Sequence, residues 1–196
     1  LYHQRLHQGN SAISHYEKTL QIEPDCLTTI HTLQSLYHEW GQFRKLVELY
    51  HKEIELISDD QLRIVNLYHE IGDIWDNKLF DGHQAIKVFE QVLADFPENM
   101  EAAVKLANIY RRHENWPQLI RVLQLLAEDA RQRDSIDEEI ALQLDLGNIY
   151  KKTGERDQAI ASFQRVLELE EFHEQAFAGL ESLYEGGGMF TDLIAT

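Results

Sequence analysis

The sequence predicts an all-α protein built as a solenoid of antiparallel helix hairpins. The chain repeats itself at a long, nearly constant interval, and a repeat of this length is typical of stacked helical units. Within each repeat, apolar residues recur every three or four positions, which is the spacing of an amphipathic helix. We expect eleven or twelve helices, with the first and last incomplete, and no strand.

The long repeat is seen in three similar segments that begin with Ala12, Ala85 and Ala159, which lie 73 and 74 residues apart. A second series, Leu46, Leu119 and Leu193, follows each of these alanines by 34 residues. The long unit is therefore a pair of shorter units of two alternating kinds. The longer intervals contain extra polar residues at 57–60 and 133–137, where we expect a helix to end and a new helix to be capped.

These spacings define one solenoid segment of about six units, with boundaries at 1–24, 25–58, 59–97, 98–134, 135–171 and 172–196. The first and last units are partial. Such a fragment would expose the apolar residues of its end units and would associate through them. The residues concerned are Tyr2, Leu6, Met189, Phe190 and Ile194.

The ends of the predicted helices carry residues that interrupt or begin helices. Gly41, Gly82, Gly154 and the run 186–188 stand at the breaks between apolar segments, and Pro24 and Pro97 follow the ends of two others. Pro117 suits the first turn of a helix, where no amide donor is needed.

One pentapeptide pattern recurs at matching positions of the repeat. Residues 146–150 read Leu-Gly-Asn-Ile-Tyr and are followed by Gly154, Ala159 and Phe163; residues 71–75 and 106–110 are similar. In this pattern the sequence resembles the tetratricopeptide-repeat family, whose unit is a helical hairpin of about 34 residues. The resemblance implies a right-handed superhelix with a concave groove that binds polypeptides. Alternate units depart from it, for example at Gln34, Glu181 and Leu119, and carry an extra aromatic residue at Phe43, Trp116 or Phe190.

Small residues at two sites of the repeat predict close contact between helices. We expect Gly72 to face Ala85 and Gly147 to face Ala159, because residues without bulky side chains let two helix backbones approach.

The net charge of -16 limits the partners of the protein. An acidic surface repels nucleic-acid phosphates and anionic lipids, so we expect neither nucleic acid nor membrane insertion. No apolar run is long enough to span a bilayer, and the single cysteine, Cys26, has no intrachain partner for a disulfide. A polypeptide partner is the remaining prediction.

The sequence holds no nucleophile elbow, phosphate-binding loop, dinucleotide fingerprint or zinc-protease motif. We therefore predict no enzymatic activity and no cofactor. Two alternatives stay open. His31, His69 and Asp73 lie at equivalent or adjacent positions of neighbouring units and could converge on a metal, although they also suit a polar groove. The segment could instead serve self-association or regulation within a larger protein.

Two sets of polar residues repeat at the same helix positions and predict a peptide-binding groove. Asn108, Arg111 and Arg112 share one helix face, and Asn148, Lys151 and Lys152 repeat the arrangement 40 residues later. The resemblance implies that both asparagines bind the main chain of an extended peptide. Val104 and Leu144 stand where chaperone-tail-binding members of the family have a lysine, so that clamp is not expected.

The same predicted face carries Asn66, His69 and Asp73 further upstream, so the groove would run from acidic to basic. We expect a partner with acidic side chains at the Arg111 and Lys151 end, because cations bind carboxylates strongly.

Overall fold

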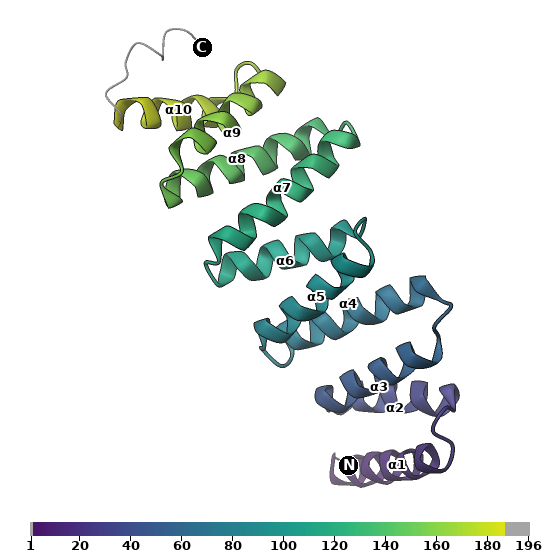
Figure 1. Ribbon diagram of the computed structural model, residues 1–196. Coiled ribbons are helices and arrows are strands. Elements are labelled where there is room, and N and C mark those ends of the chain that lie inside the picture. The colour runs from purple at the N-terminus through teal and green to yellow at the C-terminus, as the bar shows by residue number, and fades with distance from the viewer. Residues whose placement is uncertain (1, 187–196) are drawn as a thin grey trace. The chain divides into compact units, whose positions relative to one another are not determined.

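The computed structural model describes residues 2–186 of the 196-residue chain, with side chains described over 9–185. This part contains ten helices and no strand (Figure 1). They are α1 (Tyr2–Ile22), α2 (Leu27–Glu39), α3 (Phe43–Leu56), α4 (Gln61–Asn77), α5 (Gly82–Asp95), α6 (Met100–Arg112), α7 (Trp116–Gln132), α8 (Ile136–Thr153), α9 (Arg156–Leu169) and α10 (Glu174–Gly186). The prediction of an all-α solenoid of successive hairpins is confirmed. The residues expected to form one further helix, including Met189, Phe190 and Leu193, lie outside the described part, as do the side chains of Tyr2 and Leu6.

The chain divides into two compact units, residues 1–98 and 99–196. In the first unit, each helix from α1 to α5 packs against the next. In the second unit, α6 to α10 do the same, and α10 also packs against α8. At α8 and α10, contact between the first helices of successive hairpins therefore accompanies the contact within the hairpin.

Short side chains cap three helices at the turns between hairpins or within them. Asp60 accepts a hydrogen bond from the Arg63 amide at 3.0 Å, and Asn99 accepts one from the Ala102 amide at 2.9 Å. Asp81 caps α5 in the same way. Each cap satisfies an amide that has no partner inside its helix. At the other end of a helix, Gly154 ends α8 with a φ of 84°, a conformation that glycine adopts without a steric penalty.

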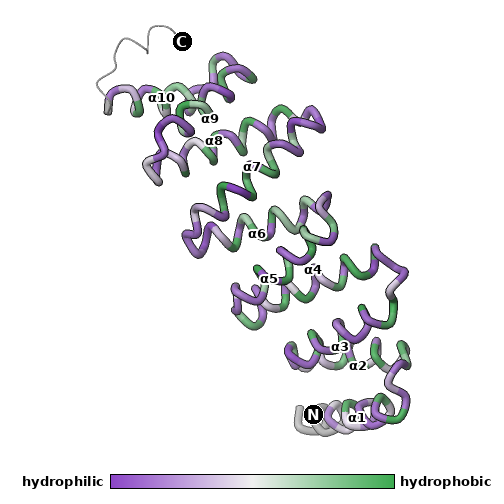
Figure 2. Tube along the Cα trace, in the orientation of Figure 1, coloured by the Kyte–Doolittle hydropathy of each residue, from purple (hydrophilic) through white to green (hydrophobic). Residues whose placement is uncertain are grey.

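Each unit buries apolar sides of its helices, and hydrophobic and hydrophilic segments alternate along the helices (Figure 2). Ile30, Leu33 and Leu46 are fully buried in the first unit. In the second unit Leu119, Ala159 and Val166 are fully buried. Burying an aliphatic side chain of the size of leucine or valine contributes roughly 1.5–3 kcal/mol, so these stripes hold the hairpins together.

Aromatic rings, rather than alanines, cover the two glycines of the repeat. A Cβ atom added at Gly147 would lie 2.7 Å from the ring of Phe163, and one added at Gly72 would collide with the ring of Phe89. The predicted partners, Ala159 and Ala85, are fully buried but stand one turn earlier on the same helices. The glycines are needed for close contact, as predicted, but the group that approaches them is the phenylalanine ring.

Candidate binding surfaces

One side of each of the helices α6, α8 and α10 is exposed, and these sides, with the adjacent exposed Arg112 and Lys152, carry six of the nine predicted groove residues. On α6 the exposed residues Val104, Asn108 and Arg111 follow one another at three- or four-residue spacing. On α8 the same spacing relates Ala141, Leu144 or Asp145, Asn148 and Lys151, and on α10 it relates Phe177, Glu181 and Glu185. This spacing places each set along one side of its helix. We call the three sets together the α6–α8–α10 face.

Two polar contacts join these helices into one surface. The Nη2 atom of Arg111 on α6 pairs with the Oδ2 atom of Asp145 on α8. Further along, the Nζ atom of Lys151 on α8 donates to the Oγ atom of Ser182 on α10 at 2.7 Å. Burial raises the pKa of Asp145, while the charge and hydrogen bond of Arg111 act in the opposite direction.

The cations of this face differ in how far their charge is compensated. Arg111 is neutralised by Asp145, and the ammonium of Lys152 lies 4.0 Å from the centre of the Trp116 ring and 3.9 Å from a carboxylate oxygen of Glu114. Lys151, in contrast, has a neutral hydroxyl as its partner. Arg112 is exposed. The local excess of positive charge is therefore smaller than the sequence indicated and is centred on Lys151.

A second cation, missed by the sequence analysis, lies beside Lys151. Arg156 begins α9 and, with Lys151, Gly154, Ser182 and Leu183, lines a pocket of about 220 Å³. Its Nη2 atom donates to the carbonyl oxygen of Leu183 at 2.8 Å. Its Nε atom is buried and has no hydrogen-bond partner in the described part of the chain. The sequence did contain a signal for this pair, because Lys151 and Arg156 stand on either side of the turn at Gly154.

The upstream groove residues belong to the first unit and are not all at the surface. Asn66 is exposed and Asp73 is half-buried. His69 is only 7% exposed, and its ring centre lies 5.8 Å from that of Phe89 on α5. The helix spacing placed His69 with the groove residues, but its side chain turns toward the second helix of its own hairpin.

His31 belongs to a different cluster, which surrounds the buried carboxylate of Glu53. Glu53 is 1% exposed and accepts hydrogen bonds from Gln34 at 2.6 Å and Arg63 at 2.9 Å, while the Nε2 atom of His31 lies 3.2 Å away. Gln34 departs from the small residue of the repeat pattern because its amide holds this carboxylate. His31, His69 and Asp73 do not form a metal site, since residues 2–186 bring no three potential ligands together.

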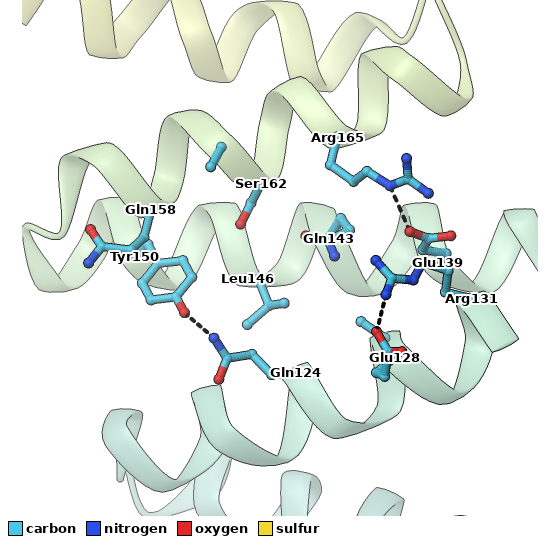
Figure 3. Close-up of a pocket in the computed structure, with 12 residues that line it drawn as sticks. Gln124, Glu128, Arg131, Glu139, Gln143, Leu146, Tyr150, Gln158, Ser162 and Arg165 are labelled. Atoms are coloured by element: carbon cyan, nitrogen blue, oxygen red, sulfur yellow. Dashed lines mark hydrogen bonds and ion pairs between the residues drawn. The ribbon is translucent and has the colours of Figure 1, made fainter.

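A cavity of about 300 Å³ lies between α7 and α9, with α8 as its floor (Figure 3). At one end Gln124 donates to the hydroxyl of Tyr150 at 2.8 Å. At the other end Arg165 binds Glu139 at 2.8 Å. Glu139 lies in the first turn of α8 beside the exposed acids Asp137 and Glu138, but it is buried and paired with Arg165. We call this cavity the α7–α9 groove.

The α6–α8–α10 face and the α7–α9 groove are both assembled by helices of the second unit, and a sequence comparison identifies the repeat at its centre. A family model described as tetratricopeptide repeat matches residues 141–171, which comprise most of α8 and all of α9. Residues 141–171 therefore form a tetratricopeptide repeat. Tetratricopeptide repeats generally act as scaffolds that bind protein or peptide partners and are typically not enzymes.

Several solved structures, two of them described as having tetratricopeptide repeats, show the same fold. A kinesin light chain of Podosopora anserina with nearly identical repeats has a TM-score of 0.52 and 18% identity, covering 88% of this chain and 92% of that one. BtubC from P. vanneervenii has a TM-score of 0.51 and 17% identity, covering 98% and 87%. YrrB, described as having an unusual peptide-binding site, has a TM-score of 0.51 and 19% identity, covering 89% and 84%. No curated protein sequence matches the chain significantly. None of the described helices is long and apolar enough to cross a membrane.

Proposed function

We propose that this protein is an interaction scaffold that holds an extended segment of a partner polypeptide on the α6–α8–α10 face. The observation that carries the proposal is the pair of exposed amides, Asn108 and Asn148, at matching positions on α6 and α8. Neither side chain makes a hydrogen bond within the described residues. A carboxamide donates and accepts together, which suits the alternating N–H and C=O groups of an extended main chain.

Apolar side chains on the same face supply contacts for the side chains of the partner. Val104 on α6 is 46% exposed and Phe177 on α10 is 43% exposed. Leu144, on the intervening first helix α8, is half-buried. Apolar and aromatic residues next to polar groups are typical of the centre of a protein-binding surface. The partner segment should therefore carry apolar residues as well as main-chain contacts.

The end of the face beside Lys151 and Arg156 fits a carboxylate of the partner. Both cations line one pocket, their hydrogen bonds go to the neutral groups of Ser182 and Leu183, and the buried Nε donor of Arg156 is unsatisfied in the described part. A buried donor without a partner is rare and costly, and an anion would satisfy it. An acidic side chain or the terminal carboxylate of the partner would supply that anion. Arg111, which the sequence favoured for this role, is already paired with Asp145.

A peptide array tests this function. The purified chain should bind peptides that combine apolar residues with one acidic group, and binding should weaken as salt is raised, because the ion pair is screened. Asn148→Ala and Lys151→Gln should each weaken binding by about 5- to 100-fold, which corresponds to losing one or two directed hydrogen bonds.

Arg121→Gln is the matched control, because Arg121 is exposed on α7 and makes no hydrogen bond or ion pair with other described residues. It removes one positive charge, as Lys151→Gln does, and should leave binding unchanged. Array peptides whose affinity is the same for the wild type, Asn148→Ala and Lys151→Gln would overturn the proposal.

A further inference from the structure

The α7–α9 groove is a second surface of the same unit, on the opposite side of α8 from the α6–α8–α10 face. Its floor consists of Glu139, Gln143, Leu146 and Tyr150. Leu146 and Tyr150 are each two residues from Asn148, so they point about 160° away from it around the helix. A ligand in the groove and a ligand on the α6–α8–α10 face would therefore not compete for the same atoms.

The groove is long and narrow. Its floor residues run from position 139 to 150 along α8, which at 1.5 Å per residue is roughly 16 Å. Figure 3 shows the lining side chains in this order, from Tyr150 and Gln158 at one end to Arg165 and Arg131 at the other. An extended chain rises about 3.3 Å per residue, so the groove has the length of about five residues of extended polypeptide.

The charged groups of the groove are already paired with one another. Arg131 binds Glu128 at 2.8 Å, and Arg165 binds Glu139 at 2.8 Å (Figure 3). These pairs leave the wall close to neutral, so a charged ligand gains no net attraction and would still have to give up water. The chemistry of the groove therefore selects an uncharged occupant.

Three polar side chains in the groove have hydrogen-bonding capacity that the protein does not use. Gln143, Gln158 and Ser162 line the cavity and make no hydrogen bond with any described residue. Ser162 is buried, and Gln143 is half-buried. Two carboxamides and a hydroxyl can donate to carbonyl oxygens and accept from amides in the same site. Gln158 is exposed at the edge of the cavity, and a ligand with both kinds of group fits the three side chains.

We propose that the α7–α9 groove is a second polypeptide-binding site, which takes an uncharged, extended segment of about five residues rich in Asn, Gln or Ser. Gln143 and Gln158 bind its main chain or its carboxamide side chains, and Ser162 adds a third contact. Ala161 borders the groove as an exposed small residue and leaves the entrance open. Binding here is independent of the α6–α8–α10 face and of the anion pocket at Lys151.

The test uses the 196-residue chain and an array of N-acetylated, C-amidated uncharged pentapeptides composed of Asn, Gln, Ser, Gly and Ala. Some of these should bind the wild type, and Ala161→Trp should lower their affinity at least about tenfold by filling the groove. Gln158→Ala should lower it by about 3- to 10-fold, because one hydrogen-bonding group is removed. Raising the salt concentration should have little effect.

Asn148→Ala separates the two sites, since it should weaken binding to the α6–α8–α10 face and leave the pentapeptides unaffected. Ala161 is exposed, so the tryptophan should not disturb the core, and the unfolding midpoint of each variant checks this. Gln158→Ala removes a group without adding bulk and keeps the test decisive if Ala161→Trp unfolds. The proposal is overturned if no uncharged pentapeptide responds to either groove substitution. It is equally overturned if a glycan array, and no peptide, gives binding that Ala161→Trp abolishes.

Discussion

Arg111 of α6 pairs with Asp145 of α8 across the surface on which the sequence predicted a free arginine. The pair joins two neighbouring hairpins and compensates the charge of one of the four predicted cations. Asp145 is one turn before Asn148, so the pair also borders the amide that is proposed to hold the partner main chain. The anionic group of a partner is therefore expected at Lys151 and Arg156 rather than at Arg111.

Removing the carboxylate of Asp145 should release Arg111 for a partner. We expect Asp145→Asn to tighten the binding of acidic peptides by about 1.4- to 5-fold at low salt, because a surface ion pair contributes roughly 0.2–1 kcal/mol and Arg111 becomes free to form one with the peptide. Isothermal titration of one acidic peptide measures this. Asp137→Asn, at an exposed position in the first turn of α8, makes the same charge change away from Arg111. Equal gains from both substitutions would assign the effect to net charge and not to the pair.

The buried carboxylate of Glu53 should make the stability of the first unit depend on pH. Burial alone would raise the pKa of Glu53, but hydrogen bonds from Arg63 and Gln34 outweigh it and lower the pKa below its ordinary value of 4.5. A lowered pKa in the folded state means that the stabilisation is present above pH 4.5 and is lost as the pH falls through the folded-state pKa. Urea unfolding at a series of pH values measures this loss.

Glu53→Gln should remove that part of the pH dependence. It should also lower the free energy of unfolding at neutral pH by roughly 1–3 kcal/mol, because Arg63 loses its buried partner. Glu55→Gln is the control, since Glu55 is exposed on the same helix and makes no hydrogen bond or ion pair with other described residues. If the free energy of unfolding of Glu53→Gln depended on pH in the same way as that of the wild type, the Glu53 carboxylate would not be the source of the pH dependence.

Two substitutions test the close contact inside the α8–α9 hairpin. Gly147→Ala should destabilise the second unit by about 1–3 kcal/mol despite the better helix propensity of alanine, because the new Cβ meets the Phe163 ring. Ala159→Leu should destabilise it by a similar amount, since Ala159 is fully buried. Chemical denaturation provides the measurement, with exposed Ala141→Leu as the control.

Phe163 itself supplies the sharper check of this contact. In a Phe163→Leu background the space above Gly147 is larger, so Gly147→Ala should cost less there than in the wild type. If the cost of Gly147→Ala were identical in both backgrounds, the ring would not be the group that requires glycine.

The sequence was sufficient to predict the helices and which of them pair in hairpins, because local spacing fixes the positions of Gly147, Ala159 and Phe163 in the repeat. It was not sufficient for contacts between helices. The partners of Arg111, Glu139 and Glu53 come from other helices, and no spacing within one helix identifies them. The placement of His69 failed for a related reason, since a residue at the edge of a helix face turns inward or outward according to its neighbours.

The α7–α9 groove could not be predicted from the sequence either, because it is formed by contacts between different helices. Gln143, Gln158 and Ser162 are ordinary polar residues in the sequence and acquire significance only when α7 and α9 place them around one cavity. Arg156 is similar, because its role depends on the carbonyl group of Leu183, which is 27 residues away.

The exposed amides of α6 and α8 are proposed to hold the main chain of a partner polypeptide. A double-mutant cycle measures this directly: an array-selected peptide and its singly N-methylated derivatives are titrated against the wild type and Asn148→Ala. We predict that N-methylation at one position weakens binding to the wild type but has little further effect on Asn148→Ala, with a coupling energy of about 1 kcal/mol or more. Strictly additive losses at every N-methylated position, for Asn148→Ala and for Asn108→Ala alike, would contradict the account.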